Sequence, residues 1–224
     1  MHQRKSKKIL IYFFLLILVG SINNNSMNNL KLEKVKNINI FGLEKNDQKI
    51  ILYNLNNLDL KNIFFINIKN LKDVIESNSL VEEYDVIKKY PDSIEIKIKK
   101  TNFIARINKN GKSYLVGNNG KLSNDNNLEI QLPYIFGSPG INEILELKKI
   151  IDHSDIEYSK IESLYYFKSN RWDLKFNNNK VIKLPEKIDE EILNNVLFLL
   201  NDIKLENKKI VDARIKNQII ISDE

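Results

Sequence analysis

The residues of this chain that could do acid–base or metal chemistry are few, and they are not spaced like a catalytic site. One histidine lies among acids and a hydroxyl, in the segment Asp152-His153-Ser154-Asp155. A single histidine flanked by acids after a helix is typical of a solvated helix end, so we predict no metal site there. The acidic clusters Glu82-Glu83 and residues 189–191 do not stand apart either, although a carboxylate pair of the glycosidase kind stays open.

The motifs that mark phosphate-binding loops, hydrolases and metalloproteases are absent from the sequence. The seven glycines are scattered singly, and neither a G-x-S-x-G nor an H-E-x-x-H pattern occurs. The chain has no cysteine, which excludes a disulfide, a thiolate nucleophile and a cysteine metal site. No motif for an active site, a cofactor or a metal ion is therefore visible in the sequence.

The charge of the chain does not predict nucleic-acid binding. The net charge is +6 and the pI is about 9.2, but four of the positive charges lie in the first eight residues, on Arg4, Lys5, Lys7 and Lys8. Without these four, the rest of the chain carries +2. No basic surface of the kind that contacts phosphates is expected outside the N-terminus.

The N-terminus predicts export from the cytoplasm. The basic residues precede an apolar run, residues 9–22, which only Gly20 and Ser21 interrupt. As a helix this run spans about 21 Å, which is shorter than the ~30 Å hydrocarbon core of a bilayer. Its length resembles the apolar region of a cleavable signal peptide, whereas its content of Leu, Ile and Phe and the lack of an Ala-x-Ala site favour an uncleaved anchor. In both alternatives the basic end stays in the cytoplasm.

Residues 35–101 predict a small α+β unit that begins with a strand at residues 35–41. Two helices follow, and Asp47 and Asn67 are placed to cap their N-termini. The alternating segments on either side of Pro91-Asp92 then predict a β-hairpin. The apolar positions of its second strand share one face, which we expect both helices to cover; they are Ile94, Ile96 and Ile98.

The remaining residues, 102–224, predict a mostly antiparallel β domain with two helices. Asn110-Gly111 and Asn119-Gly120 are favoured tight-turn pairs between short strands, and the segment LPYIFGSPG is expected as a loop. Trp172 is expected in the core. The last helix is expected to bury one stripe, made of Ile188, Ile192, Val196, Leu199 and Ile203. Asp212 and Arg214, two positions apart on one strand face, predict an edge or inter-strand ion pair rather than a catalytic pair.

Seven features in sequence order resemble the FtsQ/DivIB family of bacterial cell-division proteins, and its proteobacterial FtsQ branch most closely. The first is the basic N-terminus with its apolar segment. The others are NIFFIN, VEEYDVIKKYPDSIEIKIKKTNFIARI, GKSYLVGNNGKLS, LPYIFG, RWDLKFNNNKVIKLPE and IVDARIKNQIII. Each feature alone is weak, but their shared order covers nearly the whole chain.

The resemblance implies the fold and the domain limits. It implies a single N-terminal transmembrane helix, a POTRA domain of order β-α-α-β-β, and a β domain. The limits are then a cytoplasmic tail at residues 1–8, an uncleaved anchor at 9–26, a linker at 27–34, the POTRA domain at 35–101 and the β domain at 102–224.

The resemblance also implies a non-enzymatic scaffold of the division machinery, with no cofactor, metal ion or small-molecule substrate. It would lie in the inner membrane at the septum, with the bulk of the chain in the periplasm. Its partners would be FtsB- and FtsL-like proteins and other septal proteins, with one partner strand pairing along the last strand of the β domain. The segment QIIIS fits this use, because it is uncharged and β-branched and no Lys or Pro protects it as an edge. The expected partner-binding residues are Arg214, Gln218, Ile219, Ile220, Ile221 and Ser222.

Two other functions remain as alternatives. One is a POTRA-containing accessory of envelope protein assembly or secretion, although such proteins usually repeat the POTRA domain and no second copy is visible. The other is an exported cell-wall enzyme, for which no nucleophile, metal set or distinctive carboxylate pair is found.

Overall fold

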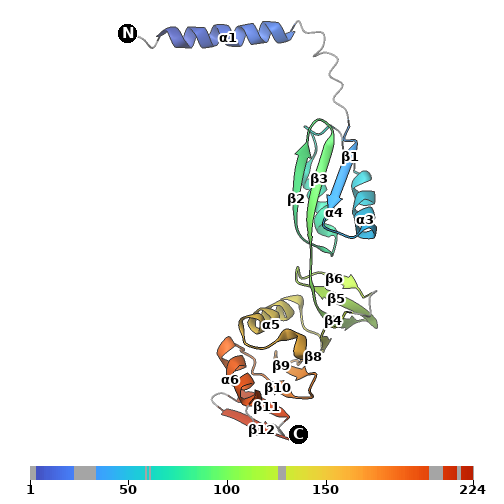
Figure 1. The fold of residues 1–224 in the computed structure, drawn as a ribbon, viewed down its shortest axis with the longest axis vertical. Coiled ribbons are helices and arrows are strands. Elements are labelled where there is room, and N and C mark those ends of the chain that lie inside the picture. The colour runs from blue at the N-terminus through green and yellow to red at the C-terminus, as the bar shows by residue number, and fades with distance from the viewer. Residues whose placement is uncertain are drawn as a thin grey trace.

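The fold is taken from a computed structural model of the chain, which describes residues 4–22, 34–58, 60, 62–125, 130–201, 209–215 and 218–223. The first element is the helix α1 (Arg4–Ile22), whose large apolar side chains from Ile9 to Val19 are all exposed. None of the helices in the described residues, α1 included, is long and apolar enough to cross a membrane. A three-stranded unit and a nine-stranded unit follow along the chain (Figure 1).

The three-stranded unit has the predicted order of elements. They are β1 (Asn37–Phe41), α3 (Lys45–Asn56), α4 (Ile68–Ser77), β2 (Val81–Lys89) and β3 (Ser93–Lys100). The strand order is β1-β3-β2, with β1 parallel and β2 antiparallel to the central β3. The connection from β1 to β3 therefore passes through both helices and the edge strand β2.

Both helices cover one face of this sheet, as predicted. Ile94, Ile96 and Ile98 of β3 are buried in one cluster with Ile51 and Leu55 of α3 and with Leu71 and Ile75 of α4. The other face of β3 is open to solvent, since Lys97 and Lys99 are exposed. The alternation of this strand thus separates a core face from a solvent face, and burial of the isoleucine row is what holds the helices.

The caps of the two helices were predicted with different success. The side chain of Asn67 caps α4 by accepting a hydrogen bond from the backbone N–H of Lys69, at 3.0 Å. The prediction for Asp47 was wrong, because α3 begins at Lys45 with Glu44 as its N-cap, and Asp47 lies in the first turn. In the first turn, the negative charge of Asp47 still stabilises α3 through its interaction with the positive end of the helix dipole.

The nine-stranded sheet has the order β12-β11-β10-β9-β8-β7-β4-β5-β6. Five of its eight strand pairs are antiparallel, and β4–β7, β7–β8 and β10–β11 are parallel. The strands are β4 (Phe103–Lys109), β5 (Lys112–Gly117), β6 (Leu122–Asn124), β7 (Tyr134–Phe136), β8 (Ile161–Tyr166), β9 (Trp172–Phe176), β10 (Val181–Lys183), β11 (Ile210–Ile215) and β12 (Gln218–Ser222). The prediction that LPYIFGSPG is only a loop was wrong, because its residues 134–136 form β7 in the middle of the sheet.

One face of this sheet is covered by helices. Directly opposite residues across five strands form a buried apolar row, made of Ile135, Leu164, Leu174, Ile182 and Val211. The row belongs to one core with α5 (Ile141–His153), α6 (Glu190–Asn201) and the loop after α5, which contains the short 3-10 helix η1 (Tyr158–Lys160). Figure 1 shows α5 and α6 beside these strands. Trp172 is buried in the same core, as predicted.

The buried stripe of α6 differs from the predicted one. Leu193, Val196 and Leu200 are buried, whereas Ile192 and Leu199 are only half-buried. Ile203, the last residue of the predicted stripe, lies outside the described residues. The segment VLFLL is apolar on more than one side of the helix, so its sequence allows two stripes and packing on the sheet selects between them.

The two units are joined by side chains of the turn after β5 and of β6. Asn119 donates its amide hydrogens to the backbone oxygens of Ser79 and Val81, at 2.9 and 2.8 Å. Lys121 donates to the oxygens of Glu76 and Asn78, and Ser123 donates to the hydroxyl of Ser79 at 2.7 Å. The junction thus uses the end of α4 and the start of β2 as acceptors.

Candidate partner-binding edge

Strand β12 lies at the end of the nine-stranded sheet and pairs, among the described residues, only with β11. The pairing is antiparallel and places Ile220 opposite Asp212 and Ile221 opposite Val211. An edge strand of this kind directs every second backbone N–H and C=O away from the sheet. Those groups are the main-chain donors and acceptors to which a further strand can bind.

The isoleucines of β12 are not part of the buried core. Ile219 is 37% exposed and Ile220 is 42% exposed, while Ile221 and Ser222 are half-buried. Ile221 lies opposite the buried Val211 and thus on the helix-covered face, so Ile220 lies on the other face. A strand that offers apolar side chains on its two faces and an open backbone edge is suited to pairing.

The face of the sheet away from the helices carries a second row of cross-strand neighbours that leads to β12. Directly opposite residues run along it in the order Phe136, Tyr165, Asp173, Lys183, Asp212 and Ile220. We call these six residues the outer row. The rings of Phe136 and Tyr165 stack with their centroids 4.9 Å apart, and Phe136 is half-exposed. The outer row therefore begins with an aromatic pair and passes through alternating charges to the edge strand.

Arg214 is turned toward Asp212, two residues before it on β11. Its guanidinium donates to both carboxylate oxygens, with Nε at 2.8 and 2.9 Å, and its backbone N–H donates to the same carboxylate at 3.1 Å. These hydrogen bonds from Arg214 are the main reason that the pKa of Asp212 is lowered. The predicted ion pair is present, but it forms along one strand rather than between strands.

Asp173 has the opposite electrostatic character. Partial burial raises the pKa of its carboxyl group, and the positive charges of Lys183, Arg214 and Arg171 oppose that rise without cancelling it. The outer row thus holds two carboxylates, of which Asp212 is held ionised and Asp173 is more easily protonated. A partner that brings a positive charge to Asp173 would relieve the cost of its burial.

The residues of β12, Arg214 and the ion-pair partner Asp212 are predicted from the sequence, whereas the other members of the outer row are not; these are Phe136, Tyr165, Asp173 and Lys183. A signal for these residues exists in the strand RWDLKF, where Trp172, Leu174 and Phe176 alternate with Asp173 and Lys175. Buried Trp172, Leu174 and Phe176 imply that Asp173 and Lys175 face the other way. Which residues stand beside Asp173 could not be predicted, because that depends on the order of strands in the sheet.

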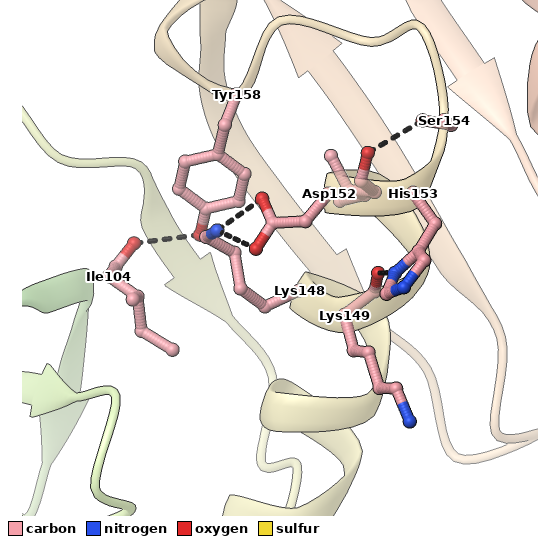
Figure 2. Close-up of polar contacts among 8 residues, drawn as sticks. Ile104, Lys148, Lys149, Asp152, His153, Ser154 and Tyr158 are labelled. Atoms are coloured by element: carbon pink, nitrogen blue, oxygen red, sulfur yellow. Dashed lines mark hydrogen bonds and ion pairs between the residues drawn. The ribbon is translucent and has the colours of Figure 1, made fainter.

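The cluster around His153 has a structural role (Figure 2). The Nδ1 atom of His153 lies 2.7 Å from the backbone oxygen of Lys149, one turn earlier in α5, and Ser154 donates to the oxygen of Ile151. Lys148 pairs with Asp152 and its Nζ lies 4.6 Å from the ring centroid of Tyr158. These contacts satisfy the C-terminal end of α5, as predicted for a helix end.

Tyr158 fastens the loop after α5 to β4. Its hydroxyl donates to the backbone oxygen of Ile104 at 2.7 Å, and burial raises the pKa of this hydroxyl (Figure 2). No group of three or more His, Cys, Asp or Glu residues that could hold a metal ion occurs within the part of the chain that the structure describes.

Comparison with known proteins accounts for both units. The model of the POTRA domain, FtsQ-type, matches residues 33–100, and the model of the cell division protein FtsQ/DivIB C-terminal domain matches residues 105–214. The cell division protein FtsQ of Rickettsia conorii is 30% identical over 196 residues, which cover 84% of this chain and 72% of that protein. This chain belongs to the FtsQ/DivIB family of cell division proteins. The predicted family and the predicted POTRA domain are therefore confirmed.

Other members of the FtsQ/DivIB family are similarly distant. The FtsQ protein of Rickettsia felis is 30% identical over 196 residues, with the same coverage of both chains. The cell division protein DivIB of Clostridium tetani is 28% identical over 157 residues, which cover 62% of this chain and 59% of that protein. The names POTRA domain and β domain are used below for the three-stranded and nine-stranded units.

Proposed function

We propose that this protein is a non-enzymatic scaffold of the divisome and that it binds an FtsB/FtsL-like complex by strand addition at β12. Membership in a family of cell division proteins supports the division role. The observation that carries the binding mode is the position of β12 at the end of the sheet, with Ile219 and Ile220 exposed. The interacting residues are then Arg214, Gln218, Ile219, Ile220, Ile221 and Ser222.

The chemistry of β12 favours a specific partner strand. Natural edge strands are usually protected by Lys, Pro or a bulge. Neither Lys nor Pro lies within residues 218–222, and the irregularity of the β11–β12 pair falls beside Ile219, between the pairs Asp212–Ile220 and Ile215–Gln218. Main-chain hydrogen bonds would supply affinity, and the side chains on the two faces of β12 would supply specificity. The one irregularity of the β11–β12 pair, between Asp212 and Ile215, lies where the hairpin turns and leaves the last residues in register.

The outer row provides a second contact for the same partner. A strand added beside β12 extends the sheet, so the chain that leads into it or out of it can cross the outer face of β11, β10 and β9. There it meets Asp212 with Arg214, then Lys183 and Asp173. Complementary charges on the partner would fix its direction and suppress wrong partners.

We propose that residues 9–26 anchor the protein in the inner membrane, with residues 1–8 in the cytoplasm and the linker 27–34, the POTRA domain 35–101 and the β domain 102–224 in the periplasm. Apolar side chains surround α1 on all sides and all are exposed, which requires apolar surroundings. Lys7 and Lys8 can reach toward the headgroups, and local thinning of the bilayer accommodates a short apolar run. Mass spectrometry of the membrane fraction tests this: residues 1–22 should be retained.

Proline at position 220 tests the binding mode. Ile220→Pro removes a backbone donor and disturbs the strand, whereas Ile220→Val keeps the donor and the β-branched shape. We expect Ile220→Pro to weaken co-purification of the FtsB- and FtsL-like proteins on the order of tenfold or more, and Ile220→Val to leave it nearly unchanged. Circular dichroism of both variants should match the parent, because β12 is an edge strand.

Two results would contradict the proposal. Normal partner binding by a folded Ile220→Pro variant would remove β12 from the interface. The division role fails separately if depletion of the protein produces defects of envelope assembly without filamentous cells, since a scaffold of the division machinery is needed at the septum.

A further inference from the structure

A cluster of exposed aromatic side chains lies at one end of the POTRA domain. Phe64 is 57% exposed, Phe65 is 73% exposed and Tyr90 is 61% exposed, and the rings of Phe64 and Tyr90 lie 5.0 Å apart. Phe64 and Phe65 belong to the segment between α3 and α4, and Tyr90 belongs to the turn between β2 and β3. We call these three residues the aromatic tip.

The backbone holds the aromatic tip outward. In the segment NIFFIN, Ile63 and Ile66 are buried in the core while the two phenylalanines between them are exposed. The buried side chain of Asn62 accepts a hydrogen bond from the N–H of Phe64 at 2.8 Å, and its backbone oxygen accepts from the N–H of Phe65 at 2.9 Å. The turn is therefore braced from beneath, and the exposure of both rings follows from the fold rather than from a loose loop.

The tip is at the end of the POTRA domain where the chain arrives from α1. Lys34 forms an isolated antiparallel β-bridge with Asn62. The backbone N–H of Lys36 donates to the backbone oxygen of Asp92, two residues after Tyr90. The β domain leaves from the opposite end, after Lys100 (Figure 1). Residues 23–33 connect α1 to this end and can span at most about 40 Å. Any membrane that holds α1 is thus within reach of the tip.

The residues around the tip suit a lipid surface. Phe and Tyr side chains are enriched where an apolar body meets polar headgroups, and positive charge adds attraction to anionic lipids. Lys34, Lys36 and Lys89 are exposed at this same end, with Lys36 near Asp92 and Lys89 near Glu95. In the part of the chain that the structure describes, each of the three rings is more than half exposed.

We propose that the aromatic tip inserts into the headgroup region of the membrane in which α1 is anchored, and so fixes the height and tilt of the POTRA domain above that membrane. The inference rests on the proposed anchor, but it does not depend on whether α1 spans the bilayer or lies at its surface. Because the anchor keeps the domain close to the membrane, the effective concentration of lipid is high, and even a weak contact of the aromatic tip can form.

Site-specific labels test the aromatic tip directly, because the chain has no native cysteine. The full chain is reconstituted into vesicles of phosphatidylethanolamine and phosphatidylglycerol as Phe65→Cys or Tyr90→Cys, each carrying an environment-sensitive fluorophore. The matched control is Phe198→Cys on α6, which replaces an equally exposed phenylalanine, 74% exposed, in the β domain. Flotation with the vesicles is measured for every variant.

The aromatic tip predicts that labels at positions 65 and 90 emit at shorter wavelength and are quenched by nitroxide lipids, whereas the label at position 198 is not. If the protein floats but labels at positions 65 and 90 emit as in water, insertion of the aromatic tip is wrong while the anchor is supported. A protein partner would then be the candidate to cover these rings. Equal quenching at all three positions also overturns it, since the contact is then unspecific. If the protein does not float with the vesicles, both the proposed membrane anchor and the proposed insertion of the aromatic tip are wrong.

Discussion

At the scale of single residues, the two carboxylates of the outer row show how the same side chain is used in opposite ways. Asp212 receives hydrogen bonds from Arg214, which stabilise its charge and lower its pKa, whereas burial of Asp173 disfavours its charge and raises its pKa. The ion pair contributes little stability by itself, because Arg214 is exposed. Both residues are better explained by a surface that a partner completes than by a need of the fold.

Asp173→Asn should stabilise the β domain at neutral pH. The pKa of Asp173 is raised in the folded state, so ionisation costs stability above its ordinary pKa, and this cost disappears as the pH falls below that value. The variant should therefore unfold at a higher urea concentration than the parent at pH 7, and the difference should shrink toward pH 3.5. Asp155→Asn, an exposed carboxylate of the same domain, is the control. If the difference in urea concentration between variant and parent grew as the pH fell, the charge of Asp173 would instead stabilise the fold.

At the scale of elements, sequence patterns predict those turns and strands whose conformation depends on residues close in the sequence. The hairpin between β4 and β5 follows from Asn110-Gly111, which adopt the positive φ angles of 55° and 75° that a tight turn of this type needs. Strand β7 could not be predicted, because three residues between Pro133 and Gly137 carry no pattern of their own. It is a strand only because β4 and β8 pair with it from distant parts of the chain.

Ile96→Lys should unfold the POTRA domain and leave the β domain folded. Ile96 is fully buried under α3 and α4, and an unpaired ammonium there costs several kcal/mol, which is comparable to the stability of a small domain. Limited proteolysis should then cut within residues 34–100 and preserve a fragment of the β domain. Lys97→Met, on the exposed face of the same strand, should give the digestion pattern of the parent. The same pattern for Ile96→Lys would mean that this row does not hold the helices.

At the scale of the whole molecule, the two sheets meet at a junction of hydrogen bonds between the residues after β5 and the region from the end of α4 to the start of β2. The junction could not be predicted, because Asn119 and Lys121 look like ordinary turn residues until the POTRA domain supplies its carbonyl acceptors. A rigid junction would let the position of the POTRA domain set the position of β12. The proposed contacts at the two ends of the molecule would then be mechanically linked.

Asn119→Ala should loosen this junction. The change removes two hydrogen bonds to the oxygens of Ser79 and Val81 and costs about 1–3 kcal/mol of coupling between the domains. Spin labels on Lys97→Cys and Lys168→Cys should report one narrow distance distribution in the parent and a broad one in the variant. Asn118→Ala, an exposed neighbour, should keep the narrow distribution. Equal widths in both variants would show that the junction is held by other contacts.

Backbone amide exchange in β12 tests most directly whether a partner strand pairs there. In the free protein, the N–H groups of β12 that bond to β11 should exchange slowly, and the alternate groups, which point away from the sheet, should exchange fast. Addition of the FtsB/FtsL-like complex should slow exchange of those alternate groups between Gln218 and Ser222, with little change in β1 or β2. Saturating complex that leaves these groups exchanging at their free rates would contradict strand addition at β12.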